Sequence, residues 1–136
     1  MSRIKTTFGE RFGLETPILG FSHSVAVTAA LCQAGGMGAY GAAHDKPADL
    51  PAKLKAIREQ VGDRPYCVDI MMPRGMPEHD TLDSVRANLP QEHLDFIQHL
   101  TEKHNVPKAT HKSFFNDTLR TPAYFEGQLQ ALLDSD

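Results

Sequence analysis

The sequence predicts an α/β fold built on a parallel sheet, of which this chain supplies about three strands. Three short apolar runs with strand character alternate with two segments of helical periodicity, and short links join them. This alternation is typical of βαβ units, in which helices connect parallel strands and pack on the sheet. The chain has 136 residues, of which 40% are hydrophobic and 23% charged, so one ordinary domain with a hydrophobic core is expected.

The first predicted strand is the short apolar run 16–21. A helix should follow, capped by Ser22 or Ser24, because a serine hydroxyl can accept a hydrogen bond from a free backbone N–H. The pair Gly35-Gly36 should end this helix. Its apolar character comes from Val25, Val27, Ala30, Leu31 and Ala34.

The second unit repeats the pattern with a strand at 37–41 and a helix that Asp49 could cap. Gly62 should end this helix. The third strand should run over 66–73, a nearly continuous apolar stretch that only Asp69 interrupts. One apolar stripe of the helix consists of Leu50, Leu54, Ile57 and Val61.

The last third of the chain is more polar. Residues 74–89 show no period and are expected to form a long loop or short irregular turns, whereas 91–105 predict a helix with one apolar face. Residues 106–121 carry no strand pattern, and 122–133 predict a further helix. The apolar faces of these two helices consist of Leu94, Ile97 and Leu100 in the first and Phe125, Leu129, Leu132 and Leu133 in the second.

Charge and composition narrow the class of partner. Fourteen Lys and Arg against 17 Asp and Glu give a net charge of −3, which favours neither a nucleic acid nor an anionic membrane. No apolar stretch reaches the roughly 20 residues of a membrane helix, and the first residues do not resemble a secretion signal. A cytoplasmic location is therefore expected. Cys32 and Cys67 are interpreted as reduced and buried, with a disulfide or a metal pair as the alternative.

A parallel sheet of three strands leaves both edges open and both apolar faces in need of cover. Two interpretations remain: a small complete three-stranded domain, or the N-terminal portion of a larger barrel or sheet.

Three segments together resemble the N-terminus of the nitronate monooxygenases, formerly called 2-nitropropane dioxygenases. They are PILG at 17–20, AGGMG at 34–38 and YCVDIMMP at 66–73, and the resemblance covers residues 8–73. That family has a TIM-barrel core, binds FMN and oxidises alkyl nitronates with molecular oxygen. A bare (β/α)₈ barrel needs about 250 residues, so the resemblance implies the N-terminal part of a barrel, with 74–136 as a loop and helical extension.

An incomplete barrel raises the question of what completes it. The resemblance implies that a second chain, or another copy in a homo-oligomer, could supply the missing strands. Two other interpretations are an inactive truncated fragment that needs a partner chain and a related FMN barrel such as an enoyl-reductase-like protein. The substrate would be a small molecule.

The resemblance also implies which residues contact FMN. In the family, backbone groups in the stretch that matches Gly20, Phe21 and Ser22 approach the flavin ring, although this chain has Phe-Ser-His where the family has Pro-Met-x. Asp69 stands where the family has a flavin-bonding Asn, and an ionised Asp can only accept hydrogen bonds. The alternative for Asp69 is a solvent-facing acid at a strand end. His23 is a candidate substrate neighbour, or simply a surface or capping residue.

The remaining candidates carry less chemistry. His44 and Asp45 follow the second strand and are interpreted as a turn. The histidines of the helix at 91–105 lack the spacing of three or four residues that would place two metal ligands on one face, so no metal site is expected there. The stretch AGGMGAYGA at 34–42 is interpreted as the joint between a helix and a strand, because no helix begins after it to bind a phosphate.

Overall fold

The computed structural model describes residues 4–72, 74–75, 82–110 and 120–135, which fall into two units. One unit comprises residues 1–74 together with 123–136, and the other comprises 75–122. No helix within the described ranges is both long enough and apolar enough to cross a membrane.

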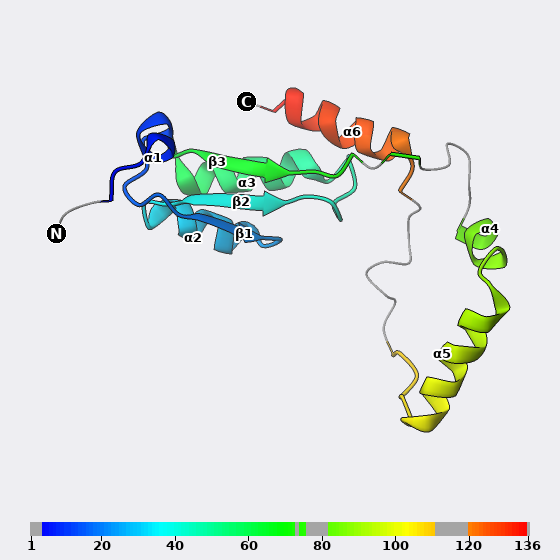
Figure 1. The fold of residues 1–136 in the computed structure, drawn as a ribbon. Coiled ribbons are helices and arrows are strands. Elements are labelled where there is room, and N and C mark those ends of the chain that lie inside the picture. The colour runs from blue at the N-terminus through cyan, green and yellow to red at the C-terminus, as the bar shows by residue number, and fades with distance from the viewer. Residues whose placement is uncertain (1–3, 73, 76–81, 111–119, 136) are drawn as a thin grey trace. The chain divides into compact units, whose positions relative to one another are not determined.

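The first unit is built on three parallel strands, β1 (Leu19–Ser22), β2 (Met37–Gly41) and β3 (Tyr66–Asp69), in the order β1-β2-β3 (Figure 1). The register pairs Gly20 with Gly38 and Gly41 with Asp69. The α/β class and the three parallel strands are thereby confirmed. The sheet is open among the described residues, so a closed barrel stays a prediction.

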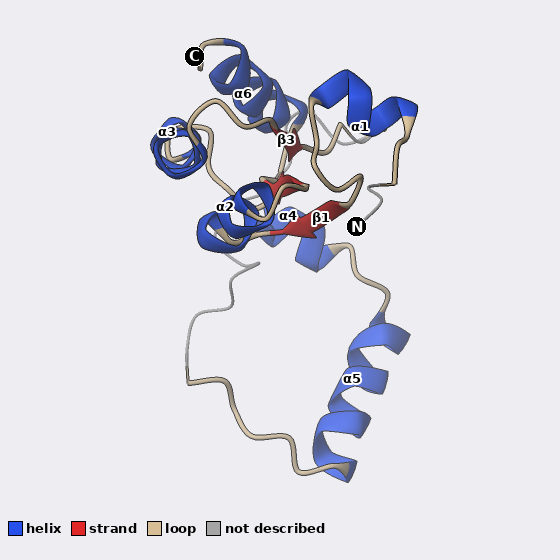
Figure 2. Ribbon diagram, turned by 90° about the vertical axis from the view of Figure 1, so that its left-hand side faces the viewer, coloured by secondary structure: helices blue, strands red, loops and turns tan. Residues whose placement is uncertain are grey.

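Helices α2 (Val25–Gln33) and α3 (Leu50–Val61) connect the strands and lie on the same face of the sheet (Figure 2). The predicted stripe of α3 is confirmed, since all four of its residues are buried. In α2 the apolar residues do not make up the buried face: Val27 is 48% exposed, and the helix buries Thr28, Ala29 and Cys32. The core of the unit consists of Ala29, Cys32, Tyr40, Ala42, Leu50, Leu54, Ile57 and Val61.

Several predicted boundaries differ from the structure. β1 begins at Leu19 rather than at residue 16, and β3 ends at Asp69 rather than at residue 73. Ser24, not Ser22, caps α2 by accepting a hydrogen bond from the N–H of Val27 at 3.4 Å. Asp49 occupies the cap position of α3 but makes no side-chain capping bond. A short helix that the sequence did not predict, α1 (Thr7–Phe12), lies near the amino ends of the strands (Figure 1).

Helix α6 (Pro122–Leu133) has the predicted bounds and lies beside β3 (Figures 1 and 2). Its buried face differs from the prediction, because Phe125 and Gln128 are buried whereas Leu129 and Leu133 are exposed. The reason is that α6 packs on the polar turn after β2 as well as on the apolar core.

The second unit falls between β3 and α6 in the sequence. It contains α4 (Leu82–Ala87), which lies within the segment predicted as a loop, and α5 (Gln91–Lys103), which ends two residues before the predicted end. The apolar face of α5 is present, but none of its residues is buried. Part of the predicted loop at 74–89 and most of the segment 106–121 lie outside the described residues.

The face of the sheet opposite α2 and α3 is apolar and partly uncovered. Because side chains alternate along a strand, Leu19 and Phe21 lie on the face opposite Gly20, whose α-carbon faces Leu31 of α2. Leu19 and Phe21 are 55% and 56% exposed. On this face the edge strand β1 therefore presents apolar side chains to solvent, whereas Met37 and Ala39 of the central strand β2 are buried.

Candidate functional site at the carboxyl edge of the sheet

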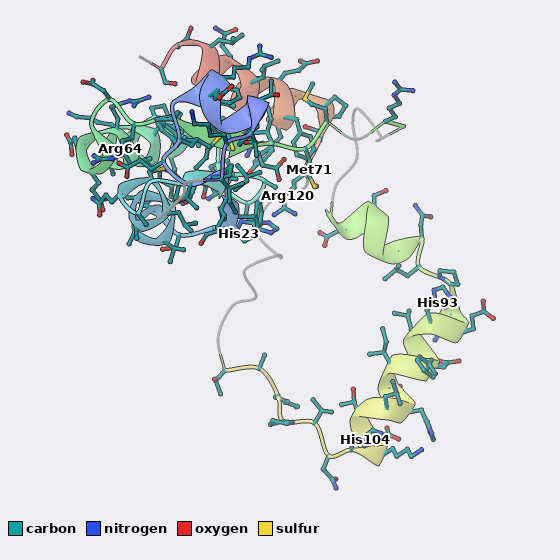
Figure 3. All side chains as sticks on the ribbon, turned by 60° about the vertical axis from the view of Figure 1, so that its left-hand side comes forward. His23, Arg64, Met71, His93, His104 and Arg120 are labelled. Carbon is teal, nitrogen blue, oxygen red and sulfur yellow. The ribbon has the colours of Figure 1, made fainter. Side chains whose placement is uncertain are left out.

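The three parallel strands end at the same edge of the sheet. Five residues that could take part in binding or catalysis lie at this edge. We call Phe21, His23, Gly41, His44 and Asp69 the carboxyl-edge cluster. Figure 3 shows His23 and Met71, which follow β1 and β3, at one end of the unit, and Arg64, which precedes β3, at the other.

His23 is oriented by a backbone group. Its Nδ1 lies 2.7 Å from the carbonyl oxygen of Gly41. A carbonyl oxygen can only accept, so Nδ1 carries a proton and donates it. The ring of Phe21 contacts the His23 ring edge-on at 5.0 Å between centroids, and the His44 ring lies 5.2 Å away. The imidazole is thus held by one hydrogen bond and two ring contacts.

Gly41 makes this arrangement possible because it has no side chain. A Cβ at this position would lie 2.4 Å from Cζ of Phe21 and 2.7 Å from Nδ1 of His23. The two rings therefore occupy the space over Gly41, and the register partner of Gly41 on β3 is Asp69. The N–H of Ala42 donates to the carbonyl oxygen of Asp69 at 2.8 Å, which ties the turn after β2 to β3.

The predicted flavin contacts divide into two groups in the structure. Phe21 and Asp69 belong to the carboxyl-edge cluster, and Asp69 is exposed. The α-carbon of Gly20 faces Leu31 of α2, and a Cβ on Gly20 would lie 2.5 Å from Cδ1 of Leu31. The absence of a side chain at Gly20 therefore lets α2 pack closely on β1. The hydroxyl of Ser22 accepts a hydrogen bond from the N–H of Ser24 at 3.0 Å. The backbone of both residues still lies at the carboxyl edge, and their contact with a cofactor stays a prediction.

A second polar group lies in the turn after β2, where the positions of His44 and Asp45 in the sequence predicted only a turn. The Asp45 carboxylate, almost completely buried, accepts hydrogen bonds from the Tyr40 hydroxyl at 2.6 Å and from the Lys53 ammonium. Burial, together with the bond to Asp45 and the charge of that residue, raises the pKa of Tyr40 to about 12. Burial lowers the pKa of Lys53, but the bond to Asp45 and its negative charge more than offset this, so that the pKa is raised overall.

Two side chains of α6 complete the group around this turn. Gln128 Nε2 donates to the carbonyl oxygens of Ala42 and Asp45, both at 2.7 Å, and the Tyr124 hydroxyl donates to the Asp45 carbonyl at 2.6 Å. The only signal in the sequence was the alternation of polar and apolar residues along α6, which does not reveal the partner of a glutamine.

Replacing Tyr40 by phenylalanine should lower the free energy of unfolding by about 1–2 kcal/mol, because Asp45 loses a buried hydrogen-bond donor.

The raised pKa of Tyr40 also predicts that the stability of the protein depends on pH. A folded pKa above the unfolded value of about 10 contributes stability that is complete below pH 10 and is lost as the pH rises through about 12. Ultraviolet absorbance should therefore show a late tyrosine ionisation that Tyr40→Phe removes. A late phase that persists in the variant would contradict the assignment.

The described residues provide no metal site and no reactive thiol. No group of three or more His, Cys, Asp or Glu among them could hold a metal ion. Both cysteines are free, and only Cys32 is fully buried. Burial, the nearby Cys32 and the charge of Asp69 raise the pKa of the Cys67 thiol, which favours its neutral form.

The carboxyl-edge cluster fits one part of FMN. The exposed Phe21 ring and the exposed Leu19 on the same face of β1 are compatible with a flat aromatic ring system. The phosphate needs a positive or N–H-rich site, whereas the cluster contains no Lys or Arg and carries the acidic Asp69. The residues therefore fit the flavin ring and leave the phosphate to be bound elsewhere.

Comparison with known proteins adds one finding to this geometry. The chain is 34% identical over 111 residues to a Mycobacterium tuberculosis protein named "Putative monooxygenase Rv1533". The match covers 79% of this chain but 30% of that protein, so the chain spans less than a third of its relative's length. That protein's name specifies neither a substrate nor a cofactor. No protein-family model matches the chain, and no solved structure matches it significantly.

Proposed function

We propose that this chain is the N-terminal segment of an FMN-dependent monooxygenase that resembles the nitronate monooxygenases and oxidises alkyl nitronates with molecular oxygen. The observation that carries the proposal is the 34% identity with the mycobacterial protein, over most of this chain. The nitronate substrate and the flavin are proposed from the resemblance of residues 8–73 to the nitronate monooxygenases. The 34% identity by itself supports only a monooxygenase. The location would be cytoplasmic.

The sheet supports the barrel part of the proposal. In a (β/α)₈ barrel, consecutive strands are neighbours, every connecting helix lies outside, and the inner face is filled by apolar side chains. The order β1-β2-β3, with α2 and α3 on one face and Leu19 and Phe21 exposed on the other, agrees with such an arrangement. The missing strands would come from a longer chain, from a second chain or from another copy of this one.

Within the proposed enzyme, the carboxyl edge would hold one side of the flavin ring. When bound, FMN would supply the group that takes electrons from the substrate and passes them to oxygen. Phe21 would pack on the ring, and the backbone of Gly20 and Ser22 would lie close to it. Asp69, if ionised, can only accept a hydrogen bond, so it would contact an N–H group of the flavin or a basic residue of the missing portion. His23 would face the substrate with Nε2.

A titration of this chain with riboflavin and with FMN, followed by backbone amide NMR signals, tests the site. We expect both ligands to shift the signals of Phe21, His23, Gly41 and Asp69, with similar weak affinity, because the cluster offers no Lys or Arg to the phosphate. Phe21→Ala should abolish the shifts. Val27→Ala, an exposed position on α2, is the matched control and should leave them unchanged.

Other outcomes would point to the alternatives. Absence of any shift, or shifts confined to other surfaces, would contradict a flavin site at this edge and favour an inactive fragment. Stoichiometric FMN that co-purifies with this polypeptide alone would contradict the proposal that the site is incomplete. A requirement for a nicotinamide in the assembled enzyme would favour an enoyl-reductase-like protein. Intact mass measurement of the native complex would identify a companion chain.

A further inference from the structure

We propose that Gln128 and Tyr124, on α6, are positioning residues for the carboxyl-edge cluster. Through two backbone carbonyls they hold the turn after β2, and this turn places His44 against His23. The inference rests on the proposed function only in assuming that this edge is the site that is used.

The turn that carries His44 is fixed from several directions. It is closed by the N–H of Asp45, which donates to the carbonyl oxygen of Ala42 at 2.9 Å. The Asp45 carboxylate is bound by Tyr40 from within the core and by Lys53 from α3. His44 lies inside this turn, so its backbone has little freedom, and its ring lies beside that of His23.

Gln128 is suited to this task because of its amide group. The two N–H bonds of one amide nitrogen reach two carbonyl oxygens, those of Ala42 and Asp45, which are the two ends of the turn. Neither leucine nor glutamate could do so, because leucine has no donor and an ionised glutamate only accepts. Gln128 is fully buried, and its Oε1 has no hydrogen-bond partner among the described residues. The structure thus tolerates an unpaired buried oxygen to keep both donors on the turn.

Tyr124 acts on the same turn from one helical turn earlier. Its hydroxyl shares the Asp45 carbonyl with Gln128, and that carbonyl accepts both bonds. Pro47, farther along the same connection, lies about 3.1 Å from where a Cβ on Gly127 would be, so α6 packs closely along this segment. Helix α6 therefore contacts the turn with both polar and apolar atoms.

The test is the contact between the two imidazole rings, measured as a nuclear Overhauser cross-peak between His23 and His44 in the flavin-free chain. We expect the cross-peak in the parent protein and its loss in Gln128→Leu and Gln128→Glu at temperatures where each variant is folded. Tyr124→Phe, which removes one hydroxyl and little else, should weaken the cross-peak. Gln130→Leu is the matched control, since Gln130 lies exposed on the same helix and bonds only to Asp134 in the described structure.

The outcomes separate positioning from simple stability. A cross-peak that persists in folded Gln128→Leu, or that keeps its full parent intensity in Tyr124→Phe, would overturn the inference, whatever the melting temperatures of the variants. If Gln128→Leu does not fold, Tyr124→Phe alone decides. Because no flavin or substrate is present, a failure of the proposed function leaves this measurement unaffected.

Discussion

Replacing Ile57 by alanine should lower the free energy of unfolding by about 2–5 kcal/mol. Ile57 is completely buried and lies in the middle of the α3 stripe, which packs in the core with residues of α2 and β2. Removing its three outer carbon atoms takes apolar surface out of the core and leaves a cavity that a close-packed interior fills only in part. Chemical denaturation followed by far-ultraviolet circular dichroism measures the change.

Ile97→Ala makes the same chemical change where the side chain is exposed. Ile97 lies on α5 and is 59% exposed, so we expect a change of less than about 0.5 kcal/mol. Equal effects of the two substitutions would contradict the assignment of the core to α2, α3 and the sheet.

Replacing Gly38 by alanine should lower the free energy of unfolding by about 3 kcal/mol, which is at the upper end of the range for overpacked cores. A Cβ at this position would lie 2.3 Å from the carbonyl oxygen of Thr28, which is a backbone atom of α2. Because a backbone atom cannot turn away, the whole helix must move off β2. Thermal unfolding should show the loss, and the variant should retain its secondary structure below the transition.

Gly20→Ala is the informative comparison, because Gly20 is the register partner of Gly38 on β1. There the new Cβ would meet the end of the Leu31 side chain, which can adopt another rotamer, so a smaller loss is expected. Equal losses of free energy of unfolding in Gly20→Ala and Gly38→Ala would contradict the distinction between a Cβ that meets a backbone atom and one that meets a side chain.

Local sequence patterns predicted those elements in which the spacing of apolar residues indicates the buried face. The spacing of Leu50, Leu54, Ile57 and Val61 fixes both the existence of α3 and the face that it buries, and the structure confirms both. The end of β3 was predicted too late, because Ile70, Met71 and Met72 are as apolar as the strand itself and sequence does not show where pairing stops. In α2, packing against β2 required small residues, which a count of apolar positions undervalues.

The site was predictable in part for the same reason. Phe21, His23 and Asp69 could be named as candidates because they lie at or just after predicted strand ends and because residues 8–73 resemble a known family, and their role in a site stays a prediction. The bonds from Gln128 to the turn after β2 join residues 83 and 86 positions apart, and no local pattern encodes them. Gly41 was expected only as the last residue of the strand at 37–41, whereas the structure places the rings of Phe21 and His23 over it.

The connection from β3 to α6 is longer than the connections from β1 to β2 and from β2 to β3, and this difference in length has an entropic consequence. Residues 70–121 separate the two elements, yet closing a longer loop costs only slightly more, about 0.6 kcal/mol for each doubling. The sheet and α6 can therefore tolerate large changes of length and composition within this segment at little cost to the folded state. The stability of the core therefore depends little on the length of this connection.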